Sequence, residues 1–361
     1  MYARMNSWVY SWFVRQIILD DKVINDASQP FVIAEIGHNH QGNIETAIKL
    51  ISAAAESGAS AAKFQKRNNE KLFIPSLYNE IYNSENSFGK TYGLHREALE
   101  FGIKEYKTCI SEAKKLGISF FATAFDIDSA TFLNELKMST FKIASGDIQN
   151  IPLIKHIAAF KKSMIISTGG ATLDMIDNAV KTIQLFHNEF AILQCTASYP
   201  ARYEHLNLRV ISSLRERYPN NVIGYSGHDN GIAMAIVAYT LGARVIEKHF
   251  TLNRTMKGTD HAFSLEPQGM QKMVRDLSRA STALGDGNKT VYELEKSPIR
   301  KMGKMIVAAR NLPAGHILTE QDFEYRSPAD GLPPSMSDSL LRKSLVGPIE
   351  KYAPINMENL I

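Results

Sequence analysis

Two histidines, His228 and His249, stand at the ends of neighbouring apolar runs, within GYSGH and EKHFT. A neutral imidazole is a frequent ligand of divalent metal ions. One histidine in such a place more often serves only as a buried hydrogen-bonding group, but two at adjacent strand ends favour a shared ion. Glu35 and Asp260 are the oxygen donors expected beside them, which favours Mn²⁺ or Mg²⁺ over thiolate-bound zinc. We therefore predict one divalent cation of the Mn²⁺ or Mg²⁺ type.

Two lysines, Lys63 and Lys142, lie within apolar runs, where an unpaired ammonium group is costly to bury. They either form salt bridges with carboxylates such as Glu35 or Asp147, or bind an anion. A Schiff base on Lys142, as in barrel aldolases, stays open as another use. Hydroxyl groups close to glycines favour a cradle for phosphate, and they belong to Ser145, Ser167, Thr168 and Ser226.

Other polar residues extend this candidate site: Gln65, Thr123 and Tyr199 follow apolar runs as well. The segment 251–267 is long and charged for a loop that follows a strand, and it contains Asp260. We expect it to be an active-site loop, with a solvated surface loop as the alternative. Cys195 has no base beside it and is expected to be a buried, inert thiol.

Eight apolar runs bounded by turn residues must position these groups, and each is followed by a segment of helical periodicity. Apolar strands that alternate with amphipathic helices predict a parallel sheet covered by helices. An open sheet would leave the polar strand ends too far apart to meet, whereas closure brings them to one face. We therefore predict a (β/α)8 TIM barrel. Its strands are expected at 30–37, 59–66, 118–125, 140–147, 163–170, 190–197, 221–228 and 244–251.

The chain divides by composition into successive parts. Residues 1–29 are expected to be an N-terminal extension with a hairpin that leads into the barrel. The opening of this extension carries both tryptophans, and we expect it to pack on the body or on a partner chain. The barrel is expected to cover 30–283. A polar, irregular linker, 284–298, then leads to a compact module, 299–361, with short strand-like runs broken by Gly and Pro.

The composition is that of a soluble globular protein, with 361 residues, 44% of them hydrophobic, and a net charge of +4. This charge is too small and too evenly spread to indicate nucleic acid or an anionic membrane as a partner. No apolar stretch is long enough to cross a bilayer, and the opening residues lack the features of a signal peptide. With only two cysteines, Cys109 and Cys195, a cytoplasmic location is expected.

Short motifs run through the chain from about residue 30 to its end: AEIGHNHQG (34–42), AAKFQK (61–66), FKIASGD (141–147), STGG (167–170), LQCTASYP (193–200), GYSGH (224–228), EKHFTL (247–252) and GTDHAFSLEP (258–267). Together they are highly specific, although no single one would be. On these motifs the sequence resembles the sialic acid synthase family, and the C-terminal module looks like the family's antifreeze-like SAF domain, a β-clip fold.

The resemblance implies condensation of phosphoenolpyruvate with N-acetylmannosamine, or its 6-phosphate, and water. The products would be N-acetylneuraminate, or its 9-phosphate, and phosphate. It also implies that the ion on His228 and His249 is Mn²⁺ before Mg²⁺ or Co²⁺. It further implies a domain-swapped homodimer in which the SAF domain reaches over the partner's barrel. For proton transfer we expect Glu35 first and Asp260 second.

The resemblance assigns phosphoenolpyruvate to the positions Lys63, Lys142, Ser145, Ser167 and Ser226. It assigns the amino sugar to Glu35, Gln65, Tyr199 and Asp260. We count Lys142 with the catalytic groups, and Thr123, Asp147 and Arg326 with the substrate-binding ones.

The chain departs from the family pattern in two places. Ser327 replaces an arginine of the C-terminal module that reaches the acetamido group, and Arg326 precedes it, so Arg326 either takes over this contact or the contact is lost. Ala197 stands where some members have an asparagine in the phosphate site. The insert 87–101 resembles the branch that accepts a 6-phosphorylated hexosamine, and it leaves the acceptor open.

Three alternatives to this function stay open. The first is a synthase of a related sugar acid, legionaminic or pseudaminic acid, on the same barrel. The second is a Schiff-base lyase that acts through Lys142. The third, from another class, is a non-catalytic sugar-binding protein whose C-terminal module does the binding. Against the third stand the many polar strand ends, which a mere scaffold would not need and which are costly to bury.

Overall fold

The computed structural model describes residues 15–361, and the opening segment with both tryptophans lies outside the described residues. The chain forms two compact units, one ending at Gly285 and the other spanning Asp286–Ile361. Among the described residues, no helix has both the length and the apolar content needed to cross a membrane.

The first unit is a closed barrel of eight parallel strands in the order β10-β3-β4-β5-β6-β7-β8-β9, which confirms the predicted (β/α)8 fold. The strands are almost wholly buried, because one face packs inside the barrel and the other lies under the helices. They are β3 (Phe31–Gly37), β4 (Ala61–Lys66), β5 (Ser119–Ala124), β6 (Thr140–Ile143), β7 (Ser163–Ser167), β8 (Phe190–Cys195), β9 (Val222–Gly227) and β10 (Val245–His249).

Several strands end earlier than the sequence predicts. β6 stops at Ile143, and Ser145–Asp147 form a 3-10 turn instead of its last residues. β7 stops at Ser167, before the two glycines of STGG. Small and turn-forming residues favour such loops at the carboxyl end of a barrel strand, where the chain must turn toward the next helix.

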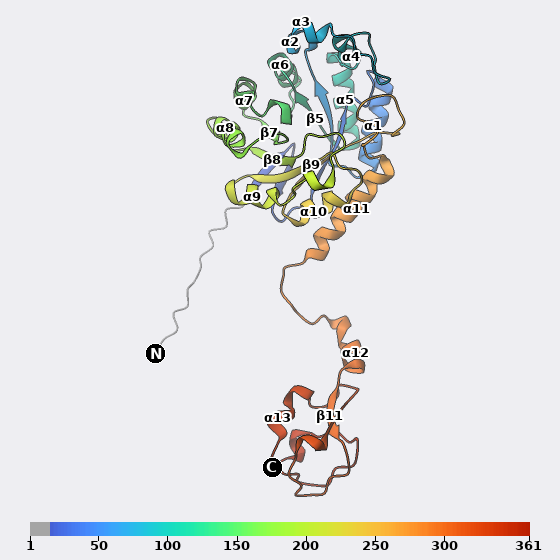
Figure 1. The fold of residues 1–361 in the computed structure, drawn as a ribbon, viewed down its shortest axis with the longest axis vertical. Coiled ribbons are helices and arrows are strands. Elements are labelled where there is room, and N and C mark those ends of the chain that lie inside the picture. The colour runs from blue at the N-terminus through green and yellow to red at the C-terminus, as the bar shows by residue number, and fades with distance from the viewer. Residues whose placement is uncertain (1–14) are drawn as a thin grey trace. The chain divides into compact units, whose positions relative to one another are not determined.

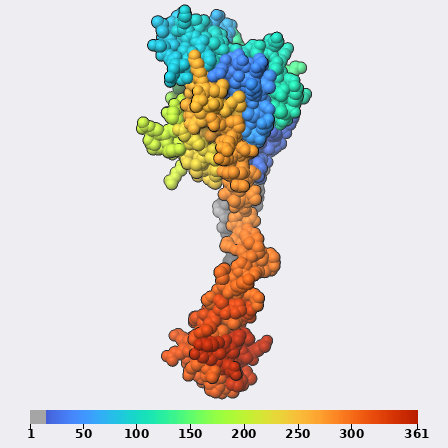
Figure 2. All heavy atoms as spheres, turned by 90° about the vertical axis from the view of Figure 1, so that its right-hand side faces the viewer, coloured from blue at the N-terminus to red at the C-terminus, as the bar shows by residue number. Residues whose placement is uncertain are grey.

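The helices surround the barrel (Figure 1). Each buries an apolar stripe on the strands, as α1 does with Ala47, Leu50 and Ile51. The last helix, α11, packs against α1 and completes the ring, as Figure 2 shows for their orange and blue surfaces. The helices are α1 (Ile44–Glu56), α5 (Ile103–Leu116), α6 (Ile127–Glu135), α7 (Ile151–Ala158), α8 (Leu173–Gln184), α9 (Val210–Arg217), α10 (Ala233–Thr240) and α11 (Pro267–Leu284).

An insert between β4 and α5 carries three short helices, α2 (Asn69–Leu72), α3 (Pro75–Tyr78) and α4 (Tyr92–Glu97). It follows the carboxyl end of β4 and contacts the loop after β10, where the side-chain oxygen of Asn86 accepts a hydrogen bond of 2.9 Å from the Gly258 amide. The insert and this loop therefore lie together at the end of the barrel where the polar residues were expected.

A hairpin of β1 (Gln16–Leu19) and β2 (Lys22–Asn25) lies across the opposite end of the barrel. Its backbone accepts hydrogen bonds from the Ser163 hydroxyl, 2.5 Å from the Ile18 carbonyl, and from the Arg244 guanidinium, 2.9 Å from the Asp26 carbonyl. Ser163 and Arg244 stand at the amino ends of strands, so the hairpin covers the end that lies away from the expected site.

The second unit has its own core around Ile306, Leu318 and Leu340. Two antiparallel strands, β11 (Met305–Ala308) and β12 (Phe323–Arg326), pair within it, and the short helix α13 spans Ser337–Leu340. The expectation of an irregular linker over 284–298 is wrong in its second half, because the helix α12 spans Glu293–Met302. Pro298 and the many charged side chains hid this helix, since proline inside a helical pattern indicates a break.

Candidate active site

A cavity of about 570 Å³ opens at the carboxyl ends of the barrel strands, and each of the eight strands contributes to its lining. The strands are parallel, so these ends converge on one face. The structure brings nearly all the predicted barrel residues together there. They are Glu35, Lys63, Gln65, Thr123, Lys142, Ser145, Ser167, Tyr199, Ser226, His228, His249 and Asp260.

Asp147 is the predicted barrel residue that lies outside this lining. It ends the 3-10 turn after β6, and its carboxylate accepts a hydrogen bond of 3.1 Å from the Asn150 side chain. The expectation that it pairs with a buried lysine is wrong for the same reason. Thr168, expected in the phosphate cradle, instead donates its hydroxyl to the Leu193 carbonyl at 2.9 Å.

Arg326 belongs to the second unit, in β12. Its guanidinium donates to the Glu324 carboxylate at 2.7 Å and stacks over the Tyr352 ring, 3.7 Å from the centroid. Its contact with a sugar stays a prediction.

The two buried lysines meet two buried carboxylates at the floor of the cavity. The Lys63 ammonium lies 2.7 Å from Glu35 and 3.5 Å from Glu247, and it donates to the Thr123 hydroxyl at 3.0 Å. The Lys142 ammonium lies 3.6 Å from Glu247 and 2.5 Å from the Ser167 hydroxyl. Glu247 therefore stands between the two lysines and neutralises part of both charges.

Burial and these charges move the pKa values of the four groups apart. Burial raises the pKa of Glu35 above its usual value, although Lys63 opposes this. Burial alone would do the same to Glu247, but Lys142 and Lys63 lower its pKa to about 2. Burial lowers the pKa of Lys142, whereas the two carboxylates outweigh burial at Lys63 and raise its pKa. Glu247 is thus a fixed anion, and Glu35 is the carboxyl group suited to proton transfer.

His228 and His249 lie side by side in the cavity, with ring centroids 5.3 Å apart. The His228 Nδ1 lies 2.9 Å from the Thr196 carbonyl, to which it must donate, so its Nε2 keeps a free lone pair. The His249 Nδ1 is buried without a hydrogen-bond partner. Burial, with His249 nearby, lowers the pKa of His228 to about 4, and burial also lowers the pKa of His249. Both rings are therefore neutral at pH 7 and fit a divalent cation.

The side chains placed to coordinate such a cation are the imidazoles of His228 and His249. Within residues 15–361, no group of three or more His, Cys, Asp or Glu is arranged to hold a metal ion. Glu35, expected as an oxygen donor, is engaged by Lys63 and by the Gln65 amide at 2.7 Å. Asp260 lies 3.7 Å from the His249 Nδ1, which is too far for a hydrogen bond. The two imidazoles would leave the other coordination positions to water and substrate oxygen.

A buried ion pair supports the two histidines from behind. Asp229 follows His228, Lys248 precedes His249, and the Lys248 ammonium lies 3.1 Å from the Asp229 carboxylate. Successive residues of a strand face opposite sides, so His249 points into the cavity while Lys248 points outward. The pair ties the end of β9 to the end of β10 and fixes the distance between the two imidazoles.

The sequence reasoning missed three charged residues of the lining: Arg67, Arg96 and Glu247. Glu247 lies inside a predicted strand, two residues before His249, so the alternation of a strand already places it on the same inner face. Arg67 continues the alternation of Lys63 and Gln65 beyond the end of β4. Nothing in the local sequence marks Arg96, because only the fold of the insert brings it to the cavity.

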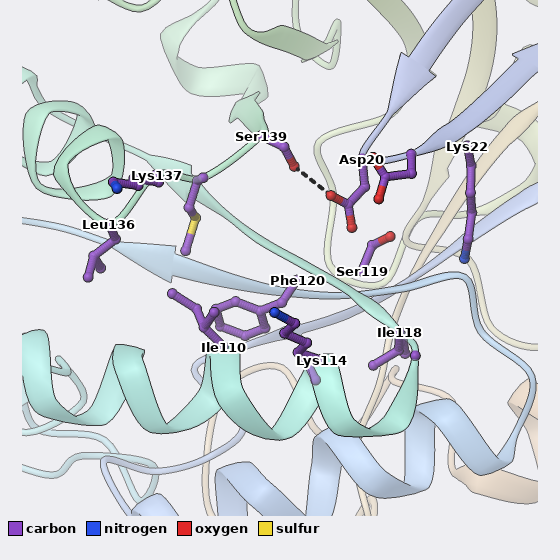
Figure 3. A pocket seen from close by; sticks show the side chains of 14 residues that line it. Asp20, Lys22, Ile110, Lys114, Ile118, Ser119, Phe120, Leu136, Lys137 and Ser139 are labelled. Atoms are coloured by element: carbon purple, nitrogen blue, oxygen red, sulfur yellow. Dashed lines mark hydrogen bonds between the residues drawn. The ribbon is translucent and has the colours of Figure 1, made fainter.

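A second hollow, of about 400 Å³, lies between the hairpin and the amino ends of β5 and β6 (Figure 3). It is lined by Ile110, Phe120 and several exposed lysines, and the Ser139 hydroxyl donates to Asp20 at 3.2 Å. This lining brings together no histidines and no buried acid, so the cavity at the carboxyl ends is the candidate site.

Comparison with known proteins agrees with this geometry. Residues 50–289 match the NeuB family, and residues 303–361 match the SAF domain. The N-acetylneuraminate-9-phosphate synthase of Mus musculus is 40% identical over 91% of this chain and 92% of its own length. The N,N'-diacetyllegionaminic acid synthase of Campylobacter jejuni is 36% identical over 86% of this chain and 94% of its own.

A solved structure extends the comparison to the fold. The N-acetylneuraminic acid synthetase of Leptospira borgpetersenii, in complex with citrate, matches with a TM-score of 0.70 and 34% identity, over 79% of this chain and 95% of that one. The predicted family, the C-terminal SAF domain and the enzyme class are thereby confirmed. The chain therefore belongs to the NeuB family and is an enzyme of the sialic acid synthase type.

Proposed function

We propose that this chain condenses phosphoenolpyruvate with N-acetylmannosamine, free or as its 6-phosphate, and with water. The products are N-acetylneuraminate, or its 9-phosphate, and inorganic phosphate. One observation carries the proposal: a single cavity holds the two buried lysines with their hydroxyls, a carboxyl group of raised pKa and two neutral imidazoles. The mouse relative, named as an N-acetylneuraminate-9-phosphate synthase, supports the same chemistry.

Phosphoenolpyruvate carries a carboxylate and a phosphate, and the cavity floor offers two cations for them. We assign these anionic groups to Lys63 and Lys142, helped by the hydroxyls of Ser145, Ser167 and Ser226. Glu247 keeps both ammonium groups charged before the substrate arrives. The lysines then stabilise the negative charge of the departing phosphate.

The carbon–carbon bond forms between C3 of phosphoenolpyruvate and the aldehyde carbon of the open-chain sugar. The aldehyde oxygen takes up a proton, C2 gains cationic character, and water adds there with loss of a proton. The tetrahedral intermediate then loses phosphate by cleavage of the bond between C2 and the phosphate oxygen, and the C2 hydroxyl gives up its proton and becomes the keto group. Glu35 is placed to carry these protons because burial raises its pKa, and Asp260 is the second candidate.

A divalent cation, Mn²⁺ first, fits the two imidazoles of His228 and His249. When bound, it supplies Lewis-acid polarisation of the sugar's aldehyde oxygen. Tyr199 packs against His228, with ring centroids 4.1 Å apart, and so covers this side of the cavity.

A synthase of a related sugar acid is the second candidate, because the legionaminic acid synthase of Campylobacter jejuni is also similar over most of its length.

The Schiff-base lyase finds one point of support in the lowered pKa of Lys142. Borohydride in the presence of pyruvate would attach mass to Lys142 in that case. The purely sugar-binding alternative is excluded by the membership of the synthase family.

The test is release of phosphate from phosphoenolpyruvate by the purified full chain with Mn²⁺. N-acetylmannosamine, its 6-phosphate and a 2,4-diacetamido sugar serve as separate acceptors, and each reaction is repeated with EDTA. We expect release with a mannosamine acceptor, its loss with EDTA and a large loss in Glu35→Gln. Release with the diacetamido sugar alone would establish the second candidate, and release with none of the three would refute the proposed reaction.

A further inference from the structure

Two arginines, Arg67 and Arg96, line the cavity nearer its mouth than the buried lysines do. Lys63, Gln65 and Arg67 alternate along the chain and share the inner face of β4 and its continuation. At about 3.3 Å per residue, the backbone of Arg67 lies roughly 13 Å further toward the mouth than that of Lys63. Arg96 reaches the same cavity from α4 of the insert.

The charges of these arginines are not balanced as those of the lysines are. Within residues 15–361, neither guanidinium forms a salt bridge with a carboxylate, whereas Lys63 and Lys142 both do. The Arg67 guanidinium contacts the neutral Gln65 amide oxygen at 2.7 Å, and Arg96 contacts the Tyr92 hydroxyl at 3.0 Å. Burial, with Arg96 nearby, lowers the pKa of Arg67 to about 10. Glu100 and Asp260 oppose this shift only from beyond salt-bridge distance. Two neighbouring cations without a directly paired carboxylate favour an anion between them.

The Arg67 guanidinium is also held in place from several sides. It stacks on the Phe125 ring, 3.7 Å from the centroid, and lies 3.2 Å from the His38 ring. Glu100, from the end of the insert, accepts the Arg67 backbone N–H at 3.1 Å and contacts Lys66 and His38 instead of the guanidinium. The carboxylate therefore fixes the backbone at Arg67, and the guanidinium N–H groups that Gln65 and His38 do not use are left for a ligand.

We propose that Arg67 and Arg96 form a subsite for a phosphate monoester on the acceptor sugar, at the end of the sugar that lies away from the aldehyde. A guanidinium donates two parallel hydrogen bonds to phosphate, and a dianionic ester matches two such groups. The inference rests on the proposed function, since the aldehyde must lie near Glu35 and the lysines. It assigns to this chain the 6-phosphate of N-acetylmannosamine as acceptor, and it makes the insert the element that selects it.

The test compares both acceptors in the wild type, Arg67→Gln and Arg96→Gln, with phosphoenolpyruvate and Mn²⁺ saturating. We expect the wild type to prefer the phosphorylated acceptor and each variant to lose about 10- to 100-fold in kcat/KM for it, the range of a charged hydrogen bond. The kcat/KM for the unphosphorylated sugar should fall by a clearly smaller factor, since Arg67 also contacts Gln65, and the KM for phosphoenolpyruvate should change by less than about threefold. The matched control is Arg202→Gln, whose exposed side chain lies outside the cavity lining and should leave both acceptors unaffected.

The outcomes separate this inference from the proposed function. Equal losses for both acceptors, or a raised KM for phosphoenolpyruvate, would overturn the subsite and leave the synthase intact. A wild type that prefers the unphosphorylated sugar would do the same. No phosphate release with any acceptor would overturn the proposed function and this inference together. Thermal melting and phosphoenolpyruvate binding, measured by calorimetry, show that each variant is folded, so a clearly larger loss for the phosphorylated acceptor supports the subsite.

Discussion

At the scale of single residues, the cavity floor is organised around Glu247. One of its carboxylate oxygens lies 3.6 Å from the Lys142 ammonium and 2.9 Å from the Ser226 hydroxyl, and the other lies 3.5 Å from Lys63. A buried carboxylate shared by two ammonium groups lets both stay charged in an environment that would otherwise favour their neutral forms. Glu247 thereby prepares the two lysines for an anionic substrate without binding it.

Replacement of Glu247 by glutamine should destabilise the substrate-free protein. It leaves two buried ammonium groups with too little negative charge, and breaking a buried pair in this way costs about 3–5 kcal/mol of unfolding free energy. Phosphoenolpyruvate should then stabilise the variant more than it stabilises the wild type, because the ligand restores the missing anion. Urea unfolding with and without phosphoenolpyruvate measures both effects.

The control for this prediction is Glu112→Gln, which breaks a surface pair with Lys115 in the same unit. It should change the unfolding free energy by less than about 1 kcal/mol. Equal stability of Glu247→Gln and the wild type would mean that the charge of Glu247 is not needed by the two lysines.

The sequence predicted the site well wherever a residue was out of place in its local context. A lysine inside an apolar strand, such as Lys63 or Lys142, can be recognised from the sequence alone because its charge conflicts with burial. Asp147 was misplaced because a strand pattern does not show where the strand gives way to a turn. Arg96 was missed because its approach to the cavity depends on contacts between segments far apart in the chain, such as Asn86 with Gly258.

At the scale of elements, the insert between β4 and α5 completes the cavity on one side. Its helix α4 carries Arg96, and the neighbouring residue His95 is buried behind it. The His95 Nδ1 accepts a hydrogen bond of 3.1 Å from the Phe88 amide, which requires an unprotonated nitrogen. The order of the insert thus depends on a neutral histidine.

We expect the insert to loosen as the pH falls below 6.5. Burial, with Arg96 nearby, lowers the pKa of His95 from 6.5 to about 4 in the folded protein. Above pH 6.5 the ring is neutral in both states, and stability is complete. Between pH 6.5 and 4 the opened insert binds a proton that the closed insert does not. Opening therefore becomes easier, by about tenfold for each pH unit below 6.5 and in total by no more than about tenfold for each unit of pKa difference. Hydrogen exchange of the α4 amides, corrected for the intrinsic effect of pH, measures this.

His95→Gln provides the comparison, because a glutamine oxygen can accept the same hydrogen bond but does not titrate. Its α4 amides should exchange with little dependence on pH over this range. His205→Gln removes an exposed histidine and should behave as the wild type does. An identical pH dependence in His95→Gln and the wild type would show that His95 does not control the insert.

At the scale of the whole molecule, the described chain consists of two units, each with a core of its own. The repeated strands and helices of the barrel made its architecture predictable, since one pattern recurs eight times. The C-terminal module has only two short strands, and its irregular segments gave little periodicity to read. The module was recognised through the family resemblance of the whole chain, and the match of residues 303–361 to the SAF domain confirms it.

The family resemblance predicts a domain-swapped homodimer, in which the SAF domain of one protomer completes the barrel of its partner, and this prediction can be tested by mixing two inactive variants. Glu35→Gln disables the barrel and keeps an intact SAF domain, whereas Arg326→Ala does the reverse if Arg326 reaches the sugar. In a swapped heterodimer, one of the two sites combines an intact barrel with an intact SAF domain. Random exchange of subunits after co-refolding should therefore restore about one quarter of the wild-type turnover, since half the dimers are mixed and half their sites are whole.

A non-swapped dimer restores none, because every site then keeps one defect. Full activity of Arg326→Ala on its own would instead show that the contact with the acetamido group is lost in this chain, and sedimentation of the wild type as a monomer would exclude the swap.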